Sequence, residues 1–181
     1  MKNNSLIKFT MKTIYNILKI TTLVSVFLSF NPNEIQAQTT DTKLNQVELM
    51  KQFLGSWKYE GTDGSSMIFD ISPFGDAMTG NTKTITKDTS FVSHLYLWGY
   101  DKSIDKIILA EIFSNTPNME IDILWFTSKN TVEGVLQKDI SNPENASIKF
   151  RFDFKSPDTF ILKVLKNNNV AAELMWNREN K

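Results

Sequence analysis

The chain has 181 residues, with 20 basic and 20 acidic side chains, one histidine and no cysteine, and 41% of its residues are hydrophobic. This composition is typical of one globular domain and excludes a disordered, collagen-like or coiled-coil chain. Without cysteine the chain has no disulfide framework, thiolate nucleophile or zinc ribbon, and a single histidine excludes a multi-histidine metal site within one chain. We therefore expect no metal site, and most hydrolase mechanisms are excluded.

Residues 1–37 have the features of a secretory signal peptide. Four lysines precede the apolar run 20–30, which is followed by the helix breaker Pro32 and the small residue Ala37. The apolar run is shorter than the roughly 20 residues that span a membrane, so we expect export with cleavage after Ala37 and no stable membrane anchor. Met11 begins an equally good signal, which leaves open whether Met1 or Met11 is the true start. The mature protein, residues 38–181, is predicted to be periplasmic or secreted.

The mature chain carries no basic patch. Residues 1–37 contain four lysines and one glutamate, so the remainder keeps 16 basic and 19 acidic groups, and its only arginines are Arg151 and Arg178. Nucleic-acid binding usually needs clustered Lys and Arg side chains. Nucleic acid is therefore not an expected partner.

Residues 42–54 are predicted to form one short amphipathic helix. Apolar side chains recur there at three- and four-residue spacing, with Asp41 or Thr42 available as the N-cap and Gly55 after the last turn. We expect the apolar stripe of this helix to dock on the domain.

From residue 55 to about residue 178 the apolar period is two, which is typical of strands. Turn signals separate ten such strands, and no gap between them is long enough for a crossover helix, so neighbouring strands should pair antiparallel. The turns fall at residues 61–64, 72–76, 87–88, 99–103, 114–118, 128–130, 139–145, 156–158 and 167–169.

The alternation predicts one dry face and one wet face. Near the C-terminus, Ile148, Phe150, Phe152 and Phe154 alternate with charged residues. Closure of such a sheet removes its exposed edges. The predicted fold is therefore all-β: a single antiparallel up-and-down β-barrel of about ten strands, preceded by one short N-terminal helix.

The chain resembles the calycin group, the lipocalin-like barrels. Gly55-Ser56-Trp57 opens the first strand directly after a short helix, and Arg178 follows the last strand. In lipocalins the tryptophan of Gly-x-Trp packs beneath the barrel and a late arginine stacks over it, so the resemblance assigns Gly55, Trp57 and Arg178 structural roles. The segment Leu97-Trp98-Gly99-Tyr100-Asp101 is similar to the Gly-Tyr-Asp turn of an uncharacterised family of bacterial exported lipocalin-like proteins.

Two departures from related barrels narrow this resemblance. Fatty-acid-binding proteins carry a helical lid between their first two strands, where this chain has only residues 61–65. The nitrobindin haem barrels read Gly-x-Trp-x-Gly-x-Gly, but Tyr59 replaces the middle glycine here, and the chain has no histidine near its C-terminus. Haem is therefore a disfavoured cofactor, and no other cofactor is expected.

The strand around His94 contains the strongest candidate ligand contacts. If His94, Tyr96 and Trp98 point inward, they provide the apolar walls and few polar groups that a ligand pocket needs. His94 is alternatively a hydrogen-bonded histidine with no special role, an axial haem ligand or a general acid and base. The sequence does not determine which face of this strand points inward.

Aromatic residues on other strands complete the predicted ligand-binding set. Trp57 and Tyr59 share one face of the first strand, and the alternation places Trp125 on the dry face with Ile121 and Ile123. Glu120 and Asp122 fall on the opposite face, where we expect them to contact solvent. The complete set is Trp57, Tyr59, His94, Tyr96, Trp98, Trp125, Phe150, Phe152 and Phe154.

These features favour an exported, non-enzymatic protein that binds a small hydrophobic or amphipathic ligand in the barrel lumen. One alternative is a barrel enzyme that acts on a lipophilic substrate with His94 as the acid and base. The other is a structural or interaction module with a packed core, whose apolar strand face at Leu95 and Leu97 contacts a partner or a second copy. The protein is expected to be a monomer or a homodimer.

Overall fold

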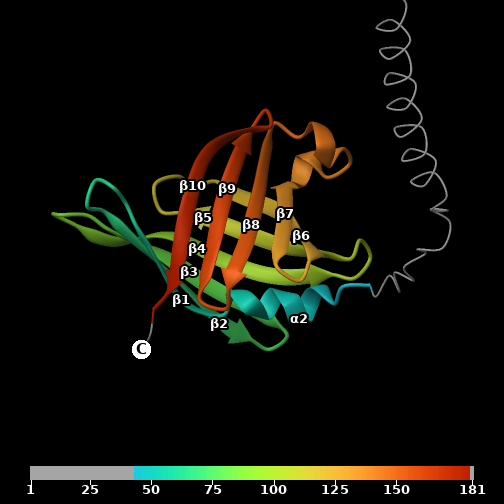
Figure 1. The fold of residues 1–181 in the computed structure, drawn as a ribbon, viewed down its shortest axis with the longest axis horizontal. Helices are drawn as coiled ribbons and strands as arrows, with labels where there is room; N and C mark the ends of the chain where they lie inside the picture. The colour runs from blue at the N-terminus through green and yellow to red at the C-terminus, as the bar shows by residue number, and fades with distance from the viewer. Residues whose placement is uncertain (1–42, 180–181) are drawn as a thin grey trace, which may run out of the picture. The chain divides into compact units, whose positions relative to one another are not determined.

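The computed structural model describes residues 43–179, which form a closed barrel of ten antiparallel strands (Figure 1). Each strand pairs with the next along the chain, and β1 pairs with β10 to close the sheet. The predicted all-β class, strand number and meander are confirmed, and the barrel is compatible with a lipocalin-like fold. The predicted signal peptide lies outside the described residues.

The strands leave only short connections, as the turn signals indicate, except for the longer segment 137–147 between the seventh and eighth strands. They are β1 (Gly55–Glu60), β2 (Ser66–Phe74), β3 (Ala77–Ile85), β4 (Ser90–Asp101), β5 (Lys106–Phe113), β6 (Met119–Ser128), β7 (Thr131–Leu136), β8 (Ile148–Ser156), β9 (Thr159–Lys166) and β10 (Asn169–Arg178). Three 3-10 segments accompany them: η2 (Lys51–Phe53), η3 (Gln137–Asp139) and η4 (Pro143–Asn145).

One predicted turn is displaced along the chain. The segment Leu97–Asp101 lies within β4, and the turn to β5 follows at residues 102–105. Asp101 Oδ1 accepts hydrogen bonds from the backbone N and the Oγ of Ser103, and Asp105 adopts a positive φ of 56°. These two aspartates, rather than Gly99, therefore shape the turn.

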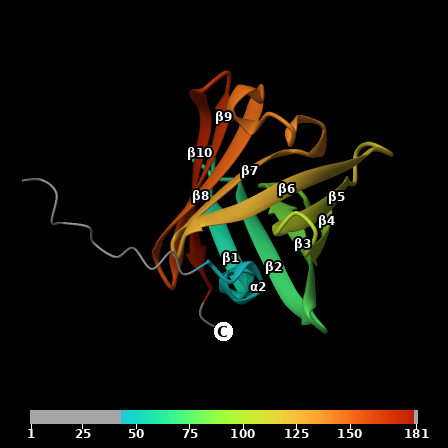
Figure 2. The same ribbon diagram turned by 90° about the vertical axis from the view of Figure 1, so that its right-hand side faces the viewer.

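The helix is shorter than predicted and crosses one end of the barrel. The α2 helix spans Gln46–Met50, because Asn45 rather than Asp41 or Thr42 is the N-cap, accepting a hydrogen bond from the backbone N of Glu48. Gln46 docks the helix on β6: its Nε2 donates to the carbonyl of Phe126, and its Oε1 accepts from the backbone N of the same residue. Figures 1 and 2 show α2 across this end, which we call the closed end.

Aromatic rings pack beneath the helix at the closed end. Phe53 is fully buried, with its ring centroid 5.0 Å from those of Trp98 and Phe154 and 5.3 Å from that of Phe152. Trp57 is also fully buried and donates from Nε1 to the carbonyl of Phe53 at 2.8 Å. The expected docking of the apolar stripe on the domain is confirmed.

The outer face of the barrel is partly covered near β6 and β7. Ile123 pairs with Val135 in the sheet, and both are buried although they point outward, because the segment 137–147 with η3 lies against these strands. Both faces of β6 are therefore apolar. This arrangement determines which β6 side chains reach the lumen.

No helix within residues 43–179 is both long and apolar enough to cross a membrane.

Candidate functional site

A cavity of about 120 Å³ remains in the lumen, and it is the candidate site. Its walls come from eight of the ten strands (β2 to β6 and β8 to β10), and about half of the lining side chains are aromatic. The lining residues are Phe69, Thr82, Tyr96, Trp98, Leu109, Glu111, Asp122, Leu124, Phe150, Phe152, Phe160, Leu162 and Trp176. Most of the barrel interior is thus filled by side chains, and what remains is small.

Sheet register brings the polar lining residues together on one wall. Tyr96 on β4 is opposite Glu111 on β5, and Asp122 on β6 is opposite Leu109, one inward position deeper than Glu111. The hydroxyl of Tyr96 lies 3.0 Å from Thr82 Oγ1 on β3. Four consecutive strands therefore contribute one polar side chain each to this wall.

Burial changes the protonation of both carboxyl groups. Burial raises the pKa of Glu111 to about 7, with a further increase from the charge of Glu120 that is opposed by hydrogen bonding to Tyr96. Burial also raises the pKa of Asp122 to about 7, with added repulsion from Glu111 and Glu120. Near neutral pH the two carboxyl groups are consequently poised to gain or lose protons.

Three buried polar atoms on residues that line the cavity have no hydrogen-bond partner among the described residues. They are Asp122 Oδ1, Trp98 Nε1 and Trp176 Nε1. Leaving a buried polar group unpaired costs about 1–3 kcal/mol, so such groups are rare and each calls for an explanation. One acceptor and two donors of this kind thus belong to residues that line the same cavity.

Four of the predicted ligand contacts line this cavity: Tyr96, Trp98, Phe150 and Phe152. Tyr59 is half-buried, with its ring 5.8 Å from that of Trp176, on the end of β1 away from α2. Trp57 and Phe154 belong to the packed closed end instead. The inward orientation of the β8 stripe is confirmed.

His94 lies beyond the cavity, at the barrel end away from α2, which we call the mouth. Its ring is 6.0 Å from the ring of Tyr96, and its Nε2 is 3.9 Å from Glu111 Oε1. Partial burial lowers the pKa of His94, which keeps the ring largely neutral at pH 7. The inward face of β4 is thus the face of Tyr96 and Trp98, with His94 near the lumen entrance.

The orientation predicted for β6 is wrong. Trp125 lies on the outer face, where Lys106 Nζ sits 4.3 Å from the centroid of its ring, while Asp122 and Leu124 line the lumen cavity. Asp122, expected to contact solvent, is only 5% exposed. The reason is the covering segment 137–147, which makes the outer face of β6 as apolar as the inner face.

Glu111 and Asp122 are the principal residues that the sequence analysis did not assign to the site. A weak signal was present: Glu111 is in phase with Ile107 and Leu109, and Asp122 with Leu124 and Phe126. An acid on the same parity as buried apolar residues indicates a carboxylate directed into the core. On β6 the apolar residues of the other parity masked this signal.

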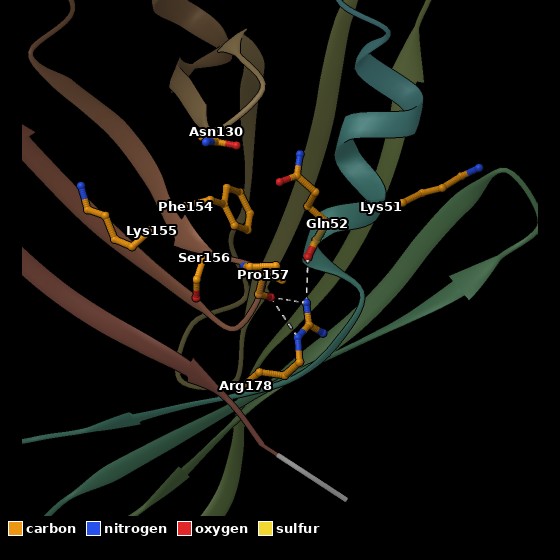
Figure 3. A pocket seen from close by; sticks show the side chains of 8 residues that line it. All are labelled: Lys51, Gln52, Asn130, Phe154, Lys155, Ser156, Pro157 and Arg178. Carbon is orange, nitrogen blue, oxygen red and sulfur yellow. Dashed lines mark hydrogen bonds between the residues drawn. The ribbon is translucent and has the colours of Figure 1, made fainter.

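A larger groove of about 520 Å³ lies outside the lumen, at the closed end (Figure 3). Its main cation, Arg178, donates to the carbonyls of Leu54, Gln52 and Pro157 and pairs with Asp158. Lys51 and Lys155 are exposed and point away from each other in Figure 3. The guanidinium of Arg178 already donates to backbone carbonyls, so it is not free to bind a ligand. We therefore take the lumen as the candidate site.

Arg178 also makes the stacking contact expected from the lipocalin resemblance. Its guanidinium carbon lies 4.1 Å from the centroid of the Trp57 ring. Gly55 has a φ of 117°, and a Cβ at this position would collide with Arg178 Nη1. The three predicted structural residues therefore meet at the closed end.

Among residues 43–179 no group of three or more His, Asp or Glu side chains is arranged to hold a metal ion. No family model matches the chain, and the comparisons found no curated protein and no solved structure with significant similarity to it.

Proposed function

We propose that this chain is an exported, non-enzymatic binding protein of the lipocalin-like kind, which holds one small amphipathic molecule in its lumen. The observation that carries the proposal is the set of three unpaired polar atoms, on Asp122, Trp98 and Trp176, around one aromatic cavity. Placed polar groups within apolar walls are the usual construction of a ligand site. A guest that carries both a donor and an acceptor has the two kinds of group that these three atoms lack.

The cavity volume limits the size of the guest. An apolar cavity of roughly 150 Å³ in another protein holds one benzene molecule, so the 120 Å³ here suits a guest of about five or six non-hydrogen atoms. Burial of its carbon atoms contributes about 25 cal/mol per Å² before association costs. The lumen is thus suited to a small metabolite rather than to a long-chain lipid.

The direct test is a high-resolution crystal structure of the protein purified from an exporting host without added small molecules, together with mass spectrometry of a solvent extract. We expect density for a non-water molecule within hydrogen-bond distance of Asp122, and a matching mass in the extract. A lumen that holds only ordered water, with no extracted molecule, would contradict the proposal.

A second candidate function, self-association, is supported by one feature of the outer surface. Leu95, Ile112 and Met119 are adjacent across β4, β5 and β6, and they are 53%, 44% and 60% exposed. Apolar side chains gathered on one surface often mark an interface. Light scattering at increasing protein concentration tests this candidate: a dimer that Leu95→Ser dissociates supports it, and a monomer at all concentrations contradicts it.

A further inference from the structure

The charge on the lumen wall indicates what kind of guest the cavity accepts. Asp122 lies on the inward face of β6 and is 5% exposed, and Glu111 beside it on β5 has a side chain that is 15% exposed. Within the described chain, no Lys or Arg pairs with either carboxylate, and the nearest basic group is His94 Nε2, 3.9 Å from Glu111. The wall therefore has negative charge without a matching cation.

The other titratable groups around this wall do not neutralise it. Glu120 on β6 adds a further carboxylate, and Tyr96 on β4 stays protonated because burial raises its pKa far above the usual range. His94 is largely neutral because burial lowers its pKa. A neutral hydrocarbon guest leaves Asp122 unpaired, and an anion adds repulsion, so both are disfavoured.

We propose that the guest is a small protonated amine, whose ammonium group pairs with Asp122 and Glu111 beside the aromatic rings of Tyr96 and Trp98. This inference rests on the proposed function, because it specifies the chemical class of the lumen guest. Ammonium groups are held by carboxylates and by the faces of aromatic rings, and both surround this cavity. The hydrogen bond between Tyr96 and Thr82 fixes the position of the Tyr96 ring.

The unpaired indole groups add a second requirement. Trp98 Nε1 and Trp176 Nε1 are donors and need an acceptor from the guest. An ammonium group provides only donors. We therefore expect the physiological amine to carry a hydroxyl, ether or carbonyl oxygen a few bonds from its nitrogen.

The experiment uses three probes that share one branched carbon skeleton and differ in charge: isobutylamine, isobutanol and isobutyrate. Binding to the purified protein is followed by two-dimensional NMR and by the fluorescence of the lumen tryptophans, at constant ionic strength. At pH 8 we expect isobutylamine to bind at least tenfold more tightly than isobutanol, and isobutyrate not to bind. For isobutylamine the affinity should fall at least tenfold from pH 8 to pH 5.5, as the carboxyl groups become protonated.

Asp122→Asn and Glu111→Gln provide two independent tests of the contacts. Each variant should bind isobutylamine at least tenfold more weakly than the unmodified protein, and its affinity for isobutanol should change less than twofold. The matched control is Glu173→Gln, which neutralises an outward acid that pairs with Lys163 on the barrel surface and should leave both affinities unchanged. The pH dependence of the unmodified protein tests the proposal even if a variant does not fold.

The outcomes separate this inference from the proposed function. If isobutanol binds as tightly as isobutylamine and neither variant discriminates between them, the lumen binds small molecules but the ammonium pairing is wrong. If isobutyrate is preferred, the inferred charge is overturned. If no probe binds, the inference fails. If the crystal structure also shows only water in the lumen, that second result contradicts the proposed function.

Discussion

The closed end of the barrel and the lumen above it are both buried and aromatic, but they differ in how their polar groups are satisfied. At the closed end, the indole of Trp57 donates to Phe53, Gln46 bonds twice to Phe126, and the guanidinium of Arg178 donates to three backbone carbonyls. In the lumen, the indoles of Trp98 and Trp176 have no partner. The indole N–H of tryptophan is thus hydrogen-bonded at the closed end and unpaired in the lumen.

This difference separates residues that the fold needs from residues that the fold only accommodates. Replacing a partnered group at the closed end removes stabilising interactions. Replacing Asp122 in the lumen removes a cost, because an unpaired buried carboxylate opposes folding. Groups that weaken a fold are often retained for function, and natural proteins rarely sit at their stability optimum.

The largest expected effect is at the closed end, from Phe53→Ala. Phe53 is fully buried and packs against five aromatic rings, so the variant should lose about 3–5 kcal/mol of unfolding free energy, measured by urea denaturation. Phe74→Ala is the control, because this residue is 72% exposed and should change stability by less than about 0.5 kcal/mol. Similar losses in the two variants would disprove the importance of the closed end.

Arg178→Lys should destabilise the same end by about 2 kcal/mol. Lysine keeps the charge but loses the planar group that stacks on Trp57 and donates to several carbonyls at once. Arg151→Lys on the outer surface is the matched change and should cost less than about 1 kcal/mol. Equal effects in urea denaturation would mean that only the charge of Arg178 matters.

Asp122→Asn should raise the stability of the protein instead of lowering it, and the size of this increase should depend on pH. The folded-state pKa of Asp122, about 7, lies above its ordinary value of 3.8, so the folded protein holds a proton that the unfolded chain releases between about pH 4 and 7. The native protein therefore loses stability as pH rises through this window. We expect the variant to be more stable by about 4 kcal/mol at pH 8 and nearly unchanged at pH 4. A pH-independent difference in thermal unfolding would contradict this prediction.

The smallest expected effect is from Trp125→Ala, which tests the corrected orientation of β6. Trp125 is outside the lumen and contacts Lys106, so the variant should lose about 1 kcal/mol of stability. Its affinity for isobutylamine should stay within twofold of the unmodified protein. A large loss of affinity would return Trp125 to the ligand site.

The fold was largely predictable from the sequence, because period-two patterning has a direct geometric meaning. On β8 only one parity is apolar, so Phe150 and Phe152 had one possible orientation, and the structure confirms it. Gly55, Trp57 and Arg178 were predictable from the lipocalin resemblance, and the geometry around Gly55 explains why no larger residue fits. Local patterns and a known barrel arrangement suffice for these features.

The lumen wall was not predictable in the same way. On β6 both parities are apolar, and only the segment 137–147, packed against the outer face, decides that Asp122 points inward. The proximity of Asp122 to Glu111 and Tyr96 depends on strand register, which residue patterns do not specify. An unpaired atom is visible only when every neighbour is placed, so the feature that carries the functional proposal appears only in three dimensions.

The most direct test of the account is a carboxyl carbon-13 NMR titration of Asp122, with and without isobutylamine. In the free protein Asp122 should titrate near pH 7, and isobutylamine should lower this pKa, because an ammonium group favours the ionised carboxylate. Titration near the ordinary value of 3.8, or a midpoint near 7 that saturating isobutylamine does not move, would contradict the claim that the lumen acids form a binding site.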